Sequence, residues 1–239
     1  HDASGISKPP FDIALEDLSD DRPLAPWWLL TMINRAVRQS RACRWLERSS
    51  SIRGTMRALD HTYSTACMRG ASVAGIEDAA HGVRLALRGR VHLRDDLIEI
   101  DDPAETFLRV DELSGDLLRT ALISAAQEMA PSWNARGAAS ELAAVMRHPR
   151  EARPGLIAQN APVTRDIIAG LSRSPANRYT FPDDPGIEAL AARDSAIRDQ
   201  YVNACAEFVA NILVVSGSLD PETTDIYTPQ EISWTKGLL

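Results

Sequence analysis

Apolar residues recur every three or four positions along most of this chain, the spacing that places them on one face of an α-helix. The pattern predicts helices at about 27–48, 52–68, 72–88, 103–129, 137–147, 163–172 and 186–215. Pro26 stands where a helix commonly begins, and the serines at 49–51 offer an N-cap for the second helix. Helix is therefore the main structure expected.

A short stretch after Gly89 departs from this period. Apolar and polar residues alternate in 91–93 and 97–100, on either side of an Arg-Asp-Asp turn at 94–96, which is typical of a β-hairpin. The sequence thus predicts a mainly α fold, a bundle-like helical domain with a small β-hairpin near 90–100.

Proline and charge divide the chain into four segments. Residues 1–25 have the composition of an acidic extended arm, and 26–148 form the helical domain with the hairpin. Residues 149–185 hold six prolines and are interpreted as a bridge with one short helix. Residues 186–239 would form a long core helix and a tail on the same domain. Asp194 lies in the apolar seam of that helix, so we expect it to be buried and paired with an arginine.

Charge is unevenly distributed. The whole chain has a net charge of −7, yet residues 35–94 hold twelve arginines and four acids, a net charge of +8. Residues 95–128 hold ten acids and two arginines, a net charge of −8. The basic block either binds an anionic partner or is neutralised by the acidic segment that follows it, and equal opposite charges favour internal pairing.

The candidate binding residues are the arginines of the first predicted helix. At 100° per residue they lie opposite its apolar side, and Trp45 projects among them, where a cation–π contact is possible. These anion- or partner-binding candidates are Arg35, Arg38, Arg41, Arg44, Arg48 and Trp45.

Residues with catalytic chemistry are few. Asp60, His61 and Cys67 lie on the second predicted helix and are the catalytic candidates, although adjacent residues do not face each other on a helix. A thiol–imidazole pair would need tertiary closure.

One acidic string has the chemistry of a metal site. Asp95, Asp96 and Glu99 offer the hard oxygen ligands that Mg²⁺ prefers. The strand-like alternation around them favours an ordinary turn, so neither a metal nor another cofactor is expected.

Several classes of protein are excluded or disfavoured. No phosphate-binding glycine loop, nucleophile elbow or zinc-binding helix motif is present. Three scattered cysteines favour a reducing, bacterial-type cytoplasmic compartment, and no apolar run is long enough to cross a membrane. Because the chain begins at His1 rather than Met, a fragment or processed form is expected.

The function expected first is a helical protein-interaction or regulatory protein with a protein partner. One alternative is an enzyme that binds a phosphorylated or other anionic small substrate through clustered arginines. Another is a nucleic-acid-binding module that uses the Arg35–Arg48 face, although a sequence pI near 5.3 counts against a dedicated nucleic-acid binder.

Overall fold

The structure is a computed structural model, and it describes residues 23–98, 102–172 and 194–232. Its helices are α1 (Trp27–Gln39), α2 (Ile52–Met68), α3 (Ile76–Leu87), α4 (Pro103–Met129), α5 (Ala135–Val145), α6 (Arg153–Asn160), α7 (Pro162–Leu171) and α9 (Ser195–Val215). A two-stranded antiparallel sheet joins β1 (Leu46–Arg48) and β2 (His92–Leu93). The prediction of a mainly α fold with one small sheet is confirmed.

The first helix is shorter than its periodicity predicts. α1 ends at Gln39 and is followed by a 3-10 turn at Ser40–Ala42, so the helix predicted over 27–48 is wrong beyond that point. The buried Ser40 hydroxyl donates to the Val37 carbonyl at 2.7 Å and accepts the Ser50 N–H at 3.3 Å. A serine that bonds the backbone in this way competes with helix formation, and the chain continues as β1.

The sheet differs from the predicted local hairpin. β2 pairs with β1, in the register Leu46 opposite Leu93 and Arg48 opposite His92. Leu97, predicted to start the second hairpin strand, lies in the 3-10 turn Asp95–Leu97, and residues 99 and 100 are outside the described part of the chain. The strands therefore come from distant segments, which an alternating pattern cannot reveal.

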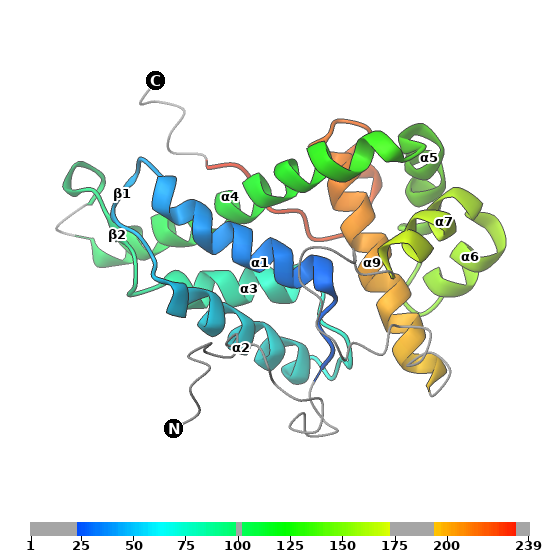
Figure 1. Cartoon of the computed structure of the whole chain (residues 1–239), viewed down its shortest axis with the longest axis horizontal. Helices are drawn as coiled ribbons and strands as arrows, with labels where there is room; N and C mark the ends of the chain where they lie inside the picture. The colour runs from blue at the N-terminus through cyan, green and yellow to red at the C-terminus, as the bar shows by residue number, and fades with distance from the viewer. Residues whose placement is uncertain (1–22, 99–101, 173–193, 233–239) are drawn as a thin grey trace, which may run out of the picture.

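Two groups of helices meet at α9. Figure 1 shows α1 to α4 and the small sheet toward one end, α5 to α7 at the other, and α9 between them. Within α9 every residue from 204 to 213 is buried, and the Phe208 ring stacks on Trp28 of α1 with centroids 4.3 Å apart. This stack ties α9 to the first helix.

The start of α9 corrects the expectation for Asp194. This residue is exposed and is the N-cap of α9, where its carboxylate accepts the Ala196 N–H at 2.7 Å. Asp194 is thus not buried, and it forms no ion pair with any arginine of the described residues; its carboxylate caps the helix that begins directly after it.

The proline-rich segment holds more helix than expected. Its described part, up to residue 172, contains both α6 and α7, each with a proline in its first turn. Proline is tolerated there because the first N–H groups of a helix have no intrahelical acceptor. The rest of this segment and residues 1–22 of the predicted arm lie outside the described residues.

α2 and α3 approach each other closely at Gly82. A Cβ atom at this position would lie 2.5 Å from the Ala58 carbonyl oxygen and 2.9 Å from the Thr62 nitrogen. Both contacts are with backbone atoms of α2, so the helices reach this separation only because residue 82 has no side chain.

Candidate functional site

Within the described residues, the acidic segment neutralises only part of the basic block. Three ion pairs join the two: Arg35 with Glu128 at 2.7 Å, Arg94 with Asp96 at 3.0 Å, and Arg88 with Asp111. A fourth arginine of the block, Arg69, pairs with Asp78 inside the block itself.

The other eight arginines of the block form no ion pair with an acid in the described residues, and most of them are exposed. They are Arg38, Arg41, Arg44, Arg48, Arg53, Arg57, Arg84 and Arg90. Among the residues that the structure describes, internal ion pairs therefore involve four of the twelve arginines of the block.

The predicted arginine face is not one face of one helix. Arg35 and Arg38 lie on α1, whereas Arg41, Arg44 and Arg48 lie in the 3-10 turn, in the following turn and at the end of β1. The Arg44 guanidinium lies 4.3 Å from the centroid of the Trp45 ring, so the expected cation–π contact is present.

A second cationic surface, which sequence reasoning missed, lies on the outer face of α2. Ile52 is 67% exposed and Met56 is 45% exposed. The two residues lie one turn apart from each other on this helix. Arg53 and Arg57 follow each of them directly and are exposed as well. We call these four residues the α2 outer face.

The burial pattern of α2 is the reverse of the one that hydrophobic periodicity predicts. α2 buries its small residues, among them Gly54, Ala58 and Ala66. Ala58 lies against Gly82 of α3, and Gly54 faces Val37 of α1. Large apolar residues are left outside, the opposite of what hydrophobic periodicity assumes.

The three catalytic candidates lie on α2 and are not brought together. Asp60 and Cys67 are exposed and His61 is half-buried, and no hydrogen bond joins their side chains in the described structure. The backbone carbonyl of Asp60 accepts the Ser64 hydroxyl, an ordinary bond within the helix.

The metal candidates are likewise dispersed. Asp96 is held by Arg94 through two hydrogen bonds of 3.0 and 3.2 Å, and Asp95 is exposed in the same 3-10 turn. Glu99 lies outside the described residues, within which no group of three or more potential metal ligands is found.

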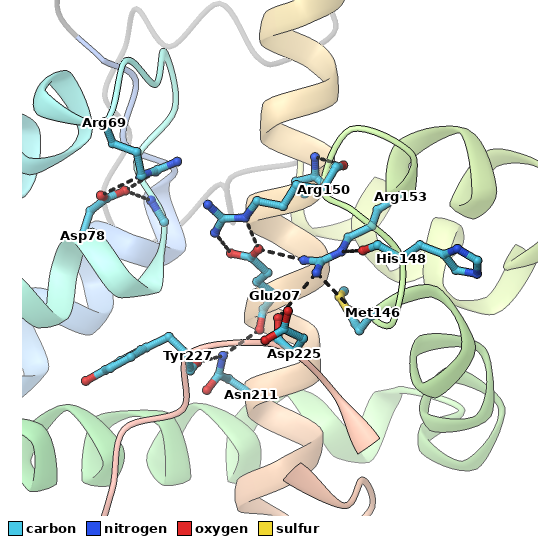
Figure 2. Close-up of polar contacts among 12 residues, drawn as sticks. Arg69, Asp78, Met146, His148, Arg150, Arg153, Glu207, Asn211, Asp225 and Tyr227 are labelled. Atoms are coloured by element: carbon cyan, nitrogen blue, oxygen red, sulfur yellow. Dashed lines mark hydrogen bonds and ion pairs between the residues drawn. The ribbon is translucent and has the colours of Figure 1, made fainter. Parts of the chain in front are cut away.

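The most elaborate polar arrangement is a buried ionic centre around Glu207, in the middle of α9 (Figure 2). Arg150 donates from Nε to Oε1 and from Nη2 to Oε2 of Glu207, both at 2.7 Å. Arg153 donates from Nη1 to Oε1 at 3.2 Å. Both oxygens of a carboxylate that is 7% exposed are therefore bound by guanidinium groups.

Arg153 also donates hydrogen bonds to backbone carbonyls of the α5–α6 connection and of the C-terminal tail. Its Nε donates to the His148 carbonyl at 2.8 Å, and its Nη2 donates to the carbonyls of Met146 and Asp225 at 3.1 and 3.4 Å (Figure 2). The segment between α5 and α6 and the C-terminal tail are thereby held against α9. Burial lowers the pKa of Arg153, and the hydrogen bond to Glu207 raises the pKa of Arg150.

A second carboxylate lies beside this centre. Asp78, which is 1% exposed, binds Arg69 through two hydrogen bonds and accepts the Gly75 N–H at 2.8 Å. A Cβ atom at Gly75 would lie 3.8 Å from Oε2 of Glu207 and 4.0 Å from Oδ2 of Asp78. The two ion-paired carboxylates thus flank one glycine at the start of α3.

This centre is built for structure rather than for proton transfer. Both oxygens of Glu207 accept hydrogen bonds from arginines, so this carboxylate holds Arg150 and Arg153 against the middle of α9. The sequence signal was a lone Glu within the apolar run of α9, but its partners could not be identified from periodicity.

Two surface cavities lie among the described residues, at opposite parts of the fold. One, of about 430 Å³, is lined by Arg48, Ser49, Ser51 and the turn at 88–90. The other, of about 560 Å³, lies between α5 and the tail segment at 218–223. The first is lined mainly by polar groups and lies at the small sheet, whereas the second has more apolar walls.

No protein-family model, curated protein or solved structure matches this chain closely enough to carry a functional argument. Within the described residues, none of the helices has the length and apolar character needed to span a bilayer.

Proposed function

We propose that this chain is a binding protein that recognises an acidic, amphipathic segment of a partner protein through the α2 outer face. The observation that carries the proposal is the combination on one surface of exposed apolar side chains, Ile52 and Met56, with Arg53 and Arg57, which have no acidic partner in the described residues. Apolar contacts would supply affinity, and the guanidinium groups would select acidic partners.

The same features favour a protein over a nucleic acid. Methionine and arginine are enriched at protein interfaces, and methionine adapts to differently shaped apolar partners. A surface that binds the nucleic-acid backbone relies on cationic and polar groups, and the exposed Ile52 and Met56 would gain nothing from phosphates.

The compartment proposed is a reducing, cytoplasmic one. Cys43, Cys67 and Cys205 are all free thiols, and Cys67 is exposed. An exposed free thiol is usual in a reducing environment and uncommon in secreted proteins.

The test is binding of a synthetic amphipathic peptide with Leu and Glu at helical spacing, measured by fluorescence anisotropy in low salt. We expect binding that weakens as salt is added. The double variants Arg53→Glu/Arg57→Glu and Ile52→Ser/Met56→Ser should each weaken it by about tenfold or more.

The control is a charge reversal elsewhere on the surface. Arg136 and Arg165 are exposed on α5 and α7, so Arg136→Glu/Arg165→Glu should leave peptide affinity within about twofold. Duplex DNA that binds more tightly than the peptide, and equally to wild type and Ile52→Ser/Met56→Ser, would favour a nucleic-acid function instead. Absence of peptide binding at low salt rejects the proposal.

A further inference from the structure

The cavity at the small sheet is formed by two turns that are far apart in the sequence. The register that places Arg48 opposite His92 brings the β1–α2 connection beside the α3–β2 turn. Ser49 and Ser51 come from the first turn, and residues 88–90 come from the second. Gly89 has φ +68°, the left-handed conformation that lets the chain leave α3 tightly.

Three guanidinium groups line this cavity of about 430 Å³. Arg88 is neutralised by Asp111, to which its Nε donates at 2.7 Å. Arg48 and Arg90 form no ion pair with an acid in the described residues, and Arg90 is half-buried. The cavity therefore carries positive charge beyond what Asp111 offsets.

Neutral donors adjoin these charges. Ser49 and Ser51, each with a hydroxyl group, line the same cavity. Ser51 is the N-cap residue of the 17-residue helix α2, yet its side chain makes no capping hydrogen bond. The Gly54 N–H donates to the Ser51 carbonyl at 2.8 Å, whereas the N–H groups of Ile52 and Arg53 precede it at the cavity edge, together with the positive end of the helix dipole.

We propose that this cavity is a binding site for a phosphomonoester group. Guanidinium forks match the geometry of phosphate oxygens, and hydroxyl and backbone N–H groups complete the set of donors usual for that anion. The lining is mainly polar, which suits a phosphoryl group better than an apolar ligand. Its volume is in the range of small-molecule sites and leaves room beyond the phosphoryl group itself.

The phosphoryl group could belong to a small phosphorylated molecule or to a phosphorylated side chain. Both present the same dianion to Arg48 and Arg90. The inference does not rest on the proposed function, because none of the four residues of the α2 outer face lines the cavity.

The first measurement is calorimetric titration of the full chain with inorganic phosphate, against sodium chloride of equal ionic strength. We expect saturable binding of phosphate only. Arg48→Gln and Arg90→Gln should each weaken it by about tenfold or more, since each removes a charge-assisted hydrogen-bond donor. Arg90→Lys, which keeps the charge but loses the fork, should bind with intermediate affinity.

Two controls keep the result interpretable. Arg136→Gln removes an exposed arginine from the other cavity and should leave phosphate affinity unchanged. Ile52→Ser/Met56→Ser changes no charge, so it should impair binding of the acidic peptide and leave phosphate affinity unchanged, and either proposal can fail alone. Circular dichroism and thermal unfolding show whether each variant is folded.

Glycerol phosphate and a phosphoserine peptide then distinguish the two sources of the group. Tighter binding of either one than of inorganic phosphate supports the site and identifies its occupant class. Phosphate that binds no better than chloride, or that binds equally to wild type and a folded Arg48→Gln/Arg90→Gln variant, overturns the proposal.

Discussion

Arg150 and Glu207 are 57 residues apart in the sequence and are joined by two hydrogen bonds of 2.7 Å. This pair fastens the segment before α6 to the middle of α9. Together with Arg153 it determines how the α5–α7 group and the tail are held against the long helix (Figure 2).

Removing the shared carboxylate should destabilise the protein strongly. In Glu207→Ala the guanidinium of Arg153, which is 4% exposed as a residue, would stay buried without its counter-charge. We expect a loss of about 3–5 kcal/mol in the free energy of unfolding, measured by urea denaturation.

The matched control is an exposed pair. Asp166→Ala removes the partner of Arg165, whose Nε lies 3.8 Å from Oδ1 of a carboxylate that is 79% exposed. Its effect should be within about 0.5 kcal/mol. Equal effects of the two substitutions would mean that the buried centre contributes no more than a surface contact.

Gly82→Ala should destabilise although alanine is the better helix former. The added Cβ atom would meet backbone atoms of Ala58 and Thr62 at 2.5 and 2.9 Å, so α2 and α3 must separate. We expect a loss of about 1–3 kcal/mol.

Gly155→Ala is the comparison for this substitution, because a Cβ atom at Gly155 of α6 meets nothing within 4 Å. It should be neutral or stabilise by up to about 1 kcal/mol. Thermal unfolding of both variants checks the pair, and a stabilising Gly82→Ala would contradict the close helix approach.

The carboxyl group of Asp116 makes stability depend on pH. Burial raises its pKa, and the hydrogen bond from the Ile232 backbone offsets this only in part. The folded state therefore retains this proton at pH values where the unfolded state, with a pKa of about 3.9, has lost it. Its contribution to stability is full below the unfolded pKa and is lost as pH rises through the folded pKa.

Asp116→Asn mimics the protonated form and keeps an oxygen that can accept from Ile232. We expect this variant to be more stable than wild type at pH 7, with a smaller difference near pH 4. Urea denaturation across that range measures the effect. A difference that is largest at pH 4 would show the opposite sign for the pKa shift.

The three thiols should react in a fixed order. Burial raises the pKa of Cys205 to about 12, so it is neither accessible nor ionised at pH 8. The exposed Cys67 should react first with Ellman's reagent, and Cys43, which is half-buried with a raised pKa, more slowly. Cys205 should react only after unfolding, and its rapid modification in native protein would contradict the burial of α9.

The sequence predicted those elements whose pattern is local. α2 and α4 have the bounds expected for them, because their residues repeat with a helical period and their starts carry a serine or an Asp-Pro signal. The range predicted for the first helix is too long because the apolar spacing continues past Ser40. The Ser40 side chain ends the helix through hydrogen bonds to Val37 and Ser50.

Candidate residues were harder to predict than helices. The concentration of arginines is visible in the sequence, and one of its candidates, Arg48, lines the cavity at the small sheet. Arg90 lines the same cavity because the pairing of β1 with β2 brings its turn beside Arg48, which the sequence pattern does not show. The α2 outer face was missed because α2 buries its small residues and exposes Ile52 and Met56.

By itself the sequence determined the helical class, most helix positions and the separation of charge, since each of these depends on neighbours within a few residues. Only the tertiary structure decided that Arg69 binds Asp78, that Arg150 and Arg153 share Glu207, and which arginines lack an acidic partner among the described residues. The reason is physical: charge pairing and strand pairing act through space, and residues brought together by folding carry no periodic signal of their partners.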